Sequence, residues 1–157
     1  MLSRILVLCV SILFAFQIQA EPVENASTIR LGSEYNFAKK AILAEFGEPL
    51  VSQENSISYS NLKYKGFQFN SVSFNFKNDK LIEMRFFINT PNKLKANQYV
   101  KKLADMMAKN YSLSMDLSDN SYFYKGGVSP KGIGHLFTIS AAKIQGEWKA
   151  ELRYGPL

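Results

Sequence analysis

The stretch SVSFNFKNDKLIEMRFFI, residues 71–88, decides the fold of this chain. On both sides of its central Lys77-Asn78-Asp79-Lys80, apolar and polar side chains alternate, and this period of two predicts half-buried strands. Asn and Asp accept the positive φ of a tight turn, so the central residues predict a hairpin. The stretch therefore predicts two neighbouring antiparallel strands that share one apolar face.

Segments on either side of this hairpin predict two helices, because their apolar residues recur every three or four positions. We expect the first helix to begin at Ser33, which can cap it, and to stop at Gly47 and Pro49. We expect the second helix to follow Pro91 and to end near Asn110. Alternating patterns predict further strands at 57–64, 111–117, 122–124, 137–141 and 148–154. Short connections leave no room for crossovers, so the expected fold is α+β, with two helices on one face of a largely antiparallel sheet.

The order of these elements predicts an internal duplication. The halves, 33–90 and 91–157, each read as one helix followed by three strands. Tyr64-Lys65-Gly66 in the first half recurs as Tyr124-Lys125-Gly126 in the second. A fixed offset with matching element order favours tandem αβββ units, and a single irregular α+β domain is the alternative.

In this element order, the chain from Ser33 onward resembles the beta-lactamase inhibitor protein family, whose members are exported and built from tandem αβββ units. The resemblance rests on the order of helices and strands and not on a motif. It implies a sheet face that binds another protein, and it implies no catalytic activity.

The amino terminus predicts export. Arg4, the apolar run from Ile5 to Phe16 and a polar exit that ends at Ala20 are typical of a secretory signal peptide, so we expect residues 1–20 to be removed. The apolar run is shorter than the roughly 20 residues that a membrane-spanning helix needs. We therefore expect no stable membrane anchor after processing.

The remainder of the chain is expected to form one domain. Residues 21–32 show no period and are predicted to be a flexible leader, which leaves 33–157 as a single α+β domain. The only cysteine, Cys9, lies in the predicted signal peptide, so the mature chain is expected to have no disulfide. Exported chains without disulfides are typical of the bacterial periplasm, and the expected location is periplasmic or secreted.

Charge and metal-ligand content exclude several functions. Lys and Arg number 19 against 13 Asp and Glu, but the lysines are dispersed, so we expect no nucleic-acid binding. We interpret these lysines as solvated helix faces, and the alternative is that they attract an acidic protein partner. The only histidine, His135, is in phase with Phe137 and is predicted to be a partly buried ring rather than a base or ligand. We expect no metal and no cofactor.

Three short patterns resemble the signatures of penicillin-binding active sites: Ser60-Asn61-Leu62-Lys63, Ser118-Asp119-Asn120 and Lys125-Gly126-Gly127. Such a serine must lie at the amino end of a helix, with its lysine one turn later. Ser60 and Lys63 lie instead in a strand-like run, where positions three apart are expected to point to opposite faces. We therefore interpret 118–120 as a turn between strands and predict that the chain is not an enzyme.

Aromatic residues are the candidates for binding. They make up 13% of the chain, which is more than the pattern of one core uses, and several fall on the polar phase of a strand. Tyr and Phe beside Arg or Lys are typical anchors of protein interfaces. The candidate partner-binding residues are Tyr122, Tyr124, Lys125, Phe87, Arg85 and Lys131.

These patterns predict an exported, non-enzymatic protein-binding domain, either inhibitor-like or an envelope accessory protein. We expect it to bind a protein partner through one sheet face and the loop between Tyr122 and Lys131. The alternative is a periplasmic carrier that holds a small apolar ligand or lipid between the helices and the sheet.

Overall fold

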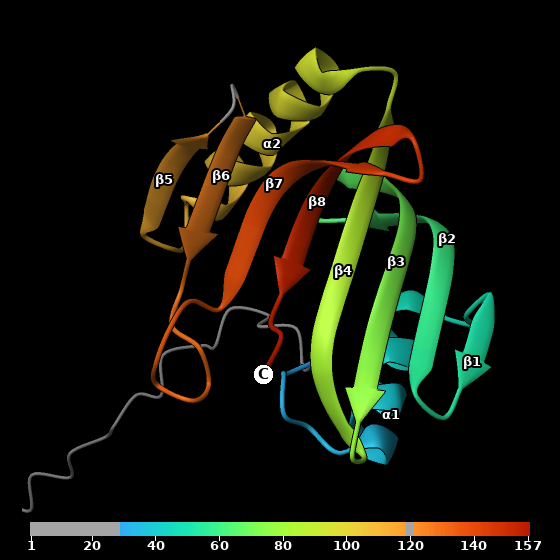
Figure 1. The fold of residues 1–157 in the computed structure, drawn as a ribbon. Coiled ribbons are helices and arrows are strands. Elements are labelled where there is room, and N and C mark those ends of the chain that lie inside the picture. Colours follow the sequence, from blue (N-terminus) through green and yellow to red (C-terminus); the bar gives the residue numbers. More distant parts are fainter. Residues whose placement is uncertain (1–28, 119–120) are drawn as a thin grey trace, which may run out of the picture.

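The computed structural model describes residues 29–118 and 121–157. Two helices lie on one face of an eight-stranded antiparallel sheet (Figure 1), which confirms the α+β class. In chain order the elements are α1 (Tyr35–Phe46), β1 (Val51–Gln53), β2 (Ser56–Tyr64), β3 (Phe67–Lys77), β4 (Lys80–Thr90), α2 (Lys93–Met107), β5 (Leu113–Ser118), β6 (Ser121–Gly126), β7 (Phe137–Ile144) and β8 (Glu147–Tyr154).

The hairpin predicted within residues 71–88 is confirmed. β3 and β4 pair antiparallel, with Lys77 opposite Lys80. Asn78 and Asp79 between them have φ values of 51° and 60°, as the two-residue turn of a hairpin requires. Phe74 of this hairpin is fully buried, and it points to the same face of the sheet as the core residues of β4.

The sheet joins two meanders through their last strands. Its order is β1-β2-β3-β4-β8-β7-β6-β5, so β4 and β8 form the central pair and β1 and β5 form the two edges (Figure 1). Each helix precedes four strands, so the predicted αβββ grouping of three strands to each half is not confirmed, although the alternating patterns predicted all four strands of the second half. In the first half the additional strand is β1, whose three exposed residues are too few to show a period in the sequence.

The core lies between the helices and the sheet. The apolar positions that recur every three or four residues in each helix face this core, as predicted. Tyr35 and Phe46 of α1 and Tyr99 and Met106 of α2 pack against this core while partly exposed. The buried helical residues are Ala38, Ala41 and Ile42 in α1 and Ala96, Val100, Leu103, Ala104 and Met107 in α2.

The fold begins before Ser33, which corrects the predicted end of the flexible leader. Ile29 and Leu31 are buried, and the Gly32 N–H donates to the Leu81 carbonyl at 2.7 Å. Residues 29–32 therefore belong to the fold, because β4 binds them by backbone hydrogen bonds. The N-cap of α1 is Glu34, and its side chain makes no capping hydrogen bond. The predicted signal peptide and residues 21–28 lie outside the described residues.

Candidate functional site

The sheet face opposite the helices is covered by none of the described elements, and we call it the open face (Figure 1). Pairing across the strands aligns its side chains in rows. One row comprises Phe123, Ser140, Glu151, Phe87 and Ser71, on β6, β7, β8, β4 and β3. The adjacent row comprises Lys125, Thr138, Arg153, Arg85 and Ser73.

Two phenylalanine rings on the open face lie beside cations. The guanidinium of Arg85 lies 4.8 Å from the centroid of the Phe87 ring, and the Lys149 Nζ lies 5.9 Å from it. The Lys125 Nζ lies 5.3 Å from the Phe123 ring. Cations at such distances are attracted by the ring face, and their apolar stems cover part of the ring. Both rings are consequently half-buried.

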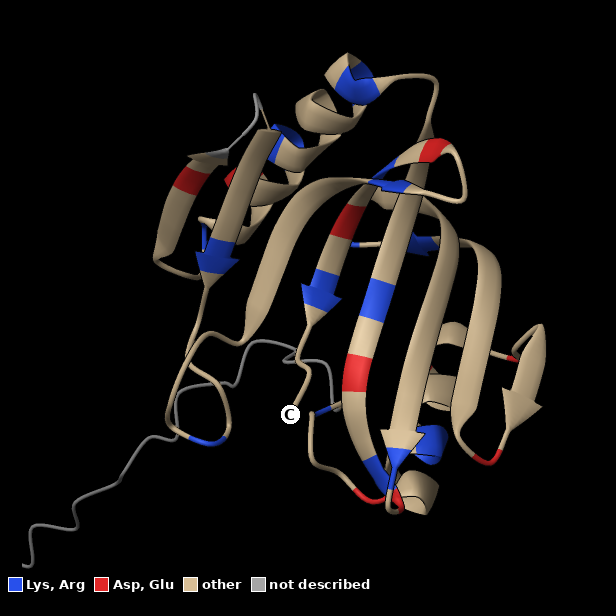
Figure 2. Cartoon of the chain, in the orientation of Figure 1, with Lys and Arg blue, Asp and Glu red and all other residues tan. Residues whose placement is uncertain are grey.

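Carboxylates already pair with these cations. Arg85 Nε donates to Glu151 Oε1 at 2.7 Å, and Arg153 forms a salt bridge with Glu83, so that two diagonal pairs join β4 and β8. Figure 2 shows the basic and acidic positions that alternate along these two strands. Lys125 Nζ lies 2.9 Å from Asp116 Oδ2. Because these pairs neutralise one another, the open face gives no support to the expectation of an acidic partner.

The structure divides the predicted partner-binding residues between surfaces. Arg85, Phe87 and Lys125 lie on the open face, as the rows above require. Lys131 is exposed in the loop between β6 and β7. The candidate residues therefore do not all lie on one surface, because Tyr122 and Tyr124 point to the other side of the sheet.

Tyr122 and Tyr124 lie on the helix side of β6, because alternate residues of a strand point to opposite faces. Lys101 of α2 has its Nζ 5.6 Å from the Tyr122 ring, and the two tyrosine rings stack at 6.3 Å. Burial, the neighbouring Tyr122 and Asp105 of α2 raise the pKa of Tyr124. Phe123, which lies on the open face, was not among the predicted binding residues. The sequence does indicate its orientation, because it lies between two tyrosines that point to the opposite face of the sheet.

Ser60 and Lys63, which match the first of the penicillin-binding patterns, are not arranged as such an active site requires. Ser60 lies within β2 rather than at a helix terminus. The expectation that Ser60 and Lys63 point to opposite faces is wrong, because Asn61 between them has a φ of 54° and shifts the alternation. Both side chains are exposed, and no hydrogen bond joins them. β5 ends at Ser118 and β6 begins at Ser121, so the predicted turn at Asp119 and Asn120 lies outside the described residues.

His135 is exposed, which corrects the predicted partly buried ring. It belongs to the glycine-rich loop before β7, which begins only at Phe137, so the strand phase does not extend to it. Within 29–118 and 121–157 no three His, Cys, Asp or Glu side chains are grouped as metal ligands would be.

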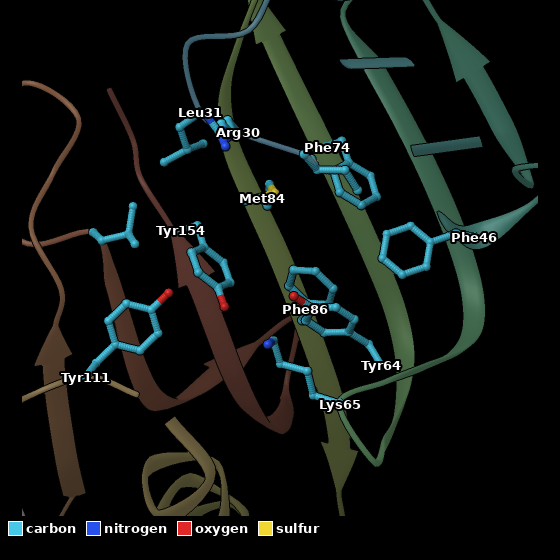
Figure 3. Close-up of a pocket in the computed structure, with 12 residues that line it drawn as sticks. Arg30, Leu31, Phe46, Tyr64, Lys65, Phe74, Met84, Phe86, Tyr111 and Tyr154 are labelled. Carbon is cyan, nitrogen blue, oxygen red and sulfur yellow. The ribbon is translucent and has the colours of Figure 1, made fainter. Parts of the chain in front are cut away.

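A cavity of about 240 Å³ lies on the helix side of the sheet (Figure 3). α1 and α2 cover different halves of this face: Phe46 of α1 contacts rings of β2 and β3, whereas α2 packs on β7 and β8. Leu31, which precedes α1, and Leu136, which precedes β7, line the cavity beside the central strands. Its aromatic lining comes from separate parts of the chain and comprises Phe46, Tyr64, Phe74, Phe86, Tyr111 and Tyr154.

Two tyrosine hydroxyls in this cavity stay protonated well above neutral pH. Burial, the main cause, raises the pKa of Tyr64 to about 12, although a hydrogen bond with Tyr154 partly offsets it. Burial likewise holds the pKa of Tyr154 well above its ordinary value. Tyr154 Oη also lies 3.8 Å from Met107 Sδ. Both hydroxyls therefore remain protonated at physiological pH, and that of Tyr154 already donates to Met107 Sδ.

Two cations line the same cavity. Lys65 follows β2 in the turn to β3, with a φ of 47°, and its Nζ lies 5.4 Å from the Tyr64 ring. Figure 3 shows its amino group directed toward the middle of the cavity. Arg30 lines the cavity from the segment before α1. Neither cation forms a salt bridge with any residue that the structure describes.

Comparisons of the chain with models of known protein families, with curated proteins and with solved structures found no match. Its class is therefore defined by its fold, an α+β protein in which two helices cover one face of an eight-stranded antiparallel sheet. In the described part of the chain, neither helix has the length and apolar character needed to cross a bilayer.

Proposed function

We propose that this chain is an exported, non-enzymatic protein-binding domain whose open face is the binding surface. One observation carries the proposal: Phe87 and Phe123 lie in a single row across an uncovered sheet, each beside Arg or Lys. Aromatic residues and Arg dominate the energetics of protein interfaces. The small side chains of Ser140 and Ser71 in the same row leave both rings accessible to a flat partner surface.

The resemblance in element order to the beta-lactamase inhibitor protein family favours an inhibitor-like role, and an envelope accessory protein is the other form of this function. The sequence pattern typical of a signal peptide at residues 1–20 supports a periplasmic or secreted location. The salt bridges on the open face favour a partner that presents charges of both signs rather than an acidic one.

We also propose that the two halves are copies of one duplicated unit. Each half is a helix followed by four antiparallel strands, and the strand order of one half mirrors that of the other. The recurring Tyr64-Lys65-Gly66 and Tyr124-Lys125-Gly126 fall at the end of the second strand in each half. Matching sequence at matching places in the fold supports duplication more strongly than the letters alone.

Binding by the open face is tested with matched surface variants. Partners are first cross-linked to the exported protein in an envelope fraction, and the affinity of each purified partner is then measured. The double variant Phe87→Ser and Phe123→Ser is expected to bind at least tenfold more weakly, a loss of about 1.4 kcal/mol or more.

The control variant is Phe37→Ser, because Phe37 is a phenylalanine of α1 that is 62% exposed on the other side of the molecule. It is expected to bind like the wild type. Equal affinity of the double variant and the wild type for every recovered partner would disprove binding by the open face.

The cavity between the helices favours a second function, a carrier of a small ligand. Ligand sites are typically concave and mostly apolar, with a few polar groups that fix orientation. The aromatic lining, the tyrosine hydroxyls and the two cations meet this description.

A further inference from the structure

The size of the cavity limits the ligand. An apolar cavity of about 150 Å³ is large enough to bind benzene. The cavity here has about 240 Å³, so it has room for one aromatic ring and a short substituent. A long acyl chain or a sterol would not fit without movement of the helices.

The lining favours an aromatic ligand over an aliphatic one. The rings of Tyr64 and Phe86 stack with centroids 5.0 Å apart, and Phe86 meets Tyr154 edge to face at 6.2 Å. Phe46 and Phe74 continue this cluster at 5.7 Å. An added ring would extend the cluster by the same stacked and edge-to-face contacts, each of which stabilises beyond the buried area alone.

The polar groups of the cavity favour a negatively charged substituent. Lys65 and Arg30 are cations on the lining, and the hydroxyls of Tyr64, Tyr111 and Tyr154 lie around the same space (Figure 3). The protonated Tyr64 hydroxyl can donate a hydrogen bond to a carboxylate, and charge-assisted bonds of this kind are stronger than neutral ones. Figure 3 shows Arg30 and Lys65 at opposite ends of the cavity, with the Lys65 amino group directed toward its aromatic rings.

We propose that this cavity binds a small aromatic carboxylic acid. The aromatic ring lies among Tyr64, Phe86 and Tyr154, and the carboxylate lies at Lys65, whose amino group points toward these rings (Figure 3). The ligand class rests on the carrier function proposed above and is independent of protein binding by the open face, which lies on the other side of the sheet.

The test compares two probes of equal size, 3-phenylpropionate and the uncharged 3-phenylpropionamide, titrated into the full protein by calorimetry. The acid is expected to bind at least tenfold more tightly than the amide. Lys65→Gln should weaken binding of the acid severalfold and leave binding of the amide unchanged, whereas Arg30→Gln, at the other end of the cavity, should change neither. Lys63→Gln is the matched control, because Lys63 is an exposed lysine of β2 that does not line the cavity.

A second measurement locates the probe. The methyl resonance of Met84, which lines the cavity, should shift during titration with the acid, and that of Met115, which is exposed on β5, should not. Equal affinity for acid and amide would overturn recognition of the carboxylate and leave the carrier function standing. Failure of both probes to bind at millimolar concentration, or binding without a shift of the Met84 resonance, would overturn both the recognition of the carboxylate and the carrier function.

Discussion

Residues with a left-handed backbone set the local geometry of this sheet. Asn61 in β2 has a φ of 54°, and on either side of it Tyr59 and Leu62 both face the core although they are three positions apart. Opposite them on β3, Val72 and Phe69 face the core in the same way. The shift at Asn61, matched on β3, therefore lets both ends of a long hairpin contribute to one core.

Gly155, immediately after β8, permits a close approach between two backbone segments. Its φ is 83°, and a Cβ placed there would lie against the Ile82 carbonyl oxygen. We expect Gly155→Ala to lower the free energy of unfolding by about 2–4 kcal/mol, from the left-handed backbone and the steric conflict together. Urea denaturation measures the loss.

Gly146→Ala is the matched control for this substitution. Gly146 has a φ of 85°, but a Cβ placed there would meet no heavy atom within 4 Å. The control should lose only about 1 kcal/mol, since only the backbone conformation is penalised. Equal losses at both glycines would show that the close approach at Ile82 has no energetic role.

At the scale of elements, the two diagonal salt bridges between β4 and β8 hold the central strands in register. Glu151 is buried, with its side chain only 9% exposed, and Arg85 is its partner. A carboxylate left buried without its partner costs far more than an exposed pair contributes. The central pair is therefore expected to matter more than the pair on β5 and β6.

We expect Arg85→Met, which keeps the apolar stem over Phe87, to destabilise the protein by about 2 kcal/mol. Lys125→Met, which breaks the exposed pair with Asp116, should cost less than about 1 kcal/mol. Chemical denaturation of both variants gives the comparison. A loss at Lys125 as large as that at Arg85 would contradict the role assigned to burial.

Elements with a clear period were predictable from the sequence, and those that depend on distant pairing were not. The hairpin of β3 and β4 was predicted because alternation and turn residues agree within one short stretch. β1 was missed, since its three residues show no pattern. The row that joins Phe87 to Phe123 depends on pairing of β4 with β8, strands far apart in sequence. The cavity was equally hidden, because its lining comes from many elements.

At the scale of the molecule, the two halves share one core and one sheet. The buried residues of α1, α2 and both meanders form a single cluster, and β4 and β8 pair along most of their lengths. Neither half can separate without exposing the face that the other half covers. Small domains with one core usually unfold in one cooperative step.

We therefore expect a single unfolding transition for the whole protein. Fluorescence of Trp148, which lies in β8 of the second half, should change at the same denaturant concentration as the far-ultraviolet circular dichroism of the whole chain. Two separated transitions would mean that the halves fold independently and that the shared sheet contributes little to stability.

The tripeptide Tyr-Lys-Gly has different surroundings in its two places. Lys65 leaves β2 through a left-handed turn and its charge is available to the cavity, whereas Lys125 stays within β6 and pairs its charge with Asp116. An acylating reagent that removes the charge of both lysines would thus act at two unrelated places at once: the lining of the cavity on one side of the sheet and the ion pair between β5 and β6 on the other. The same three residues therefore have separate roles, because the geometry around each copy differs.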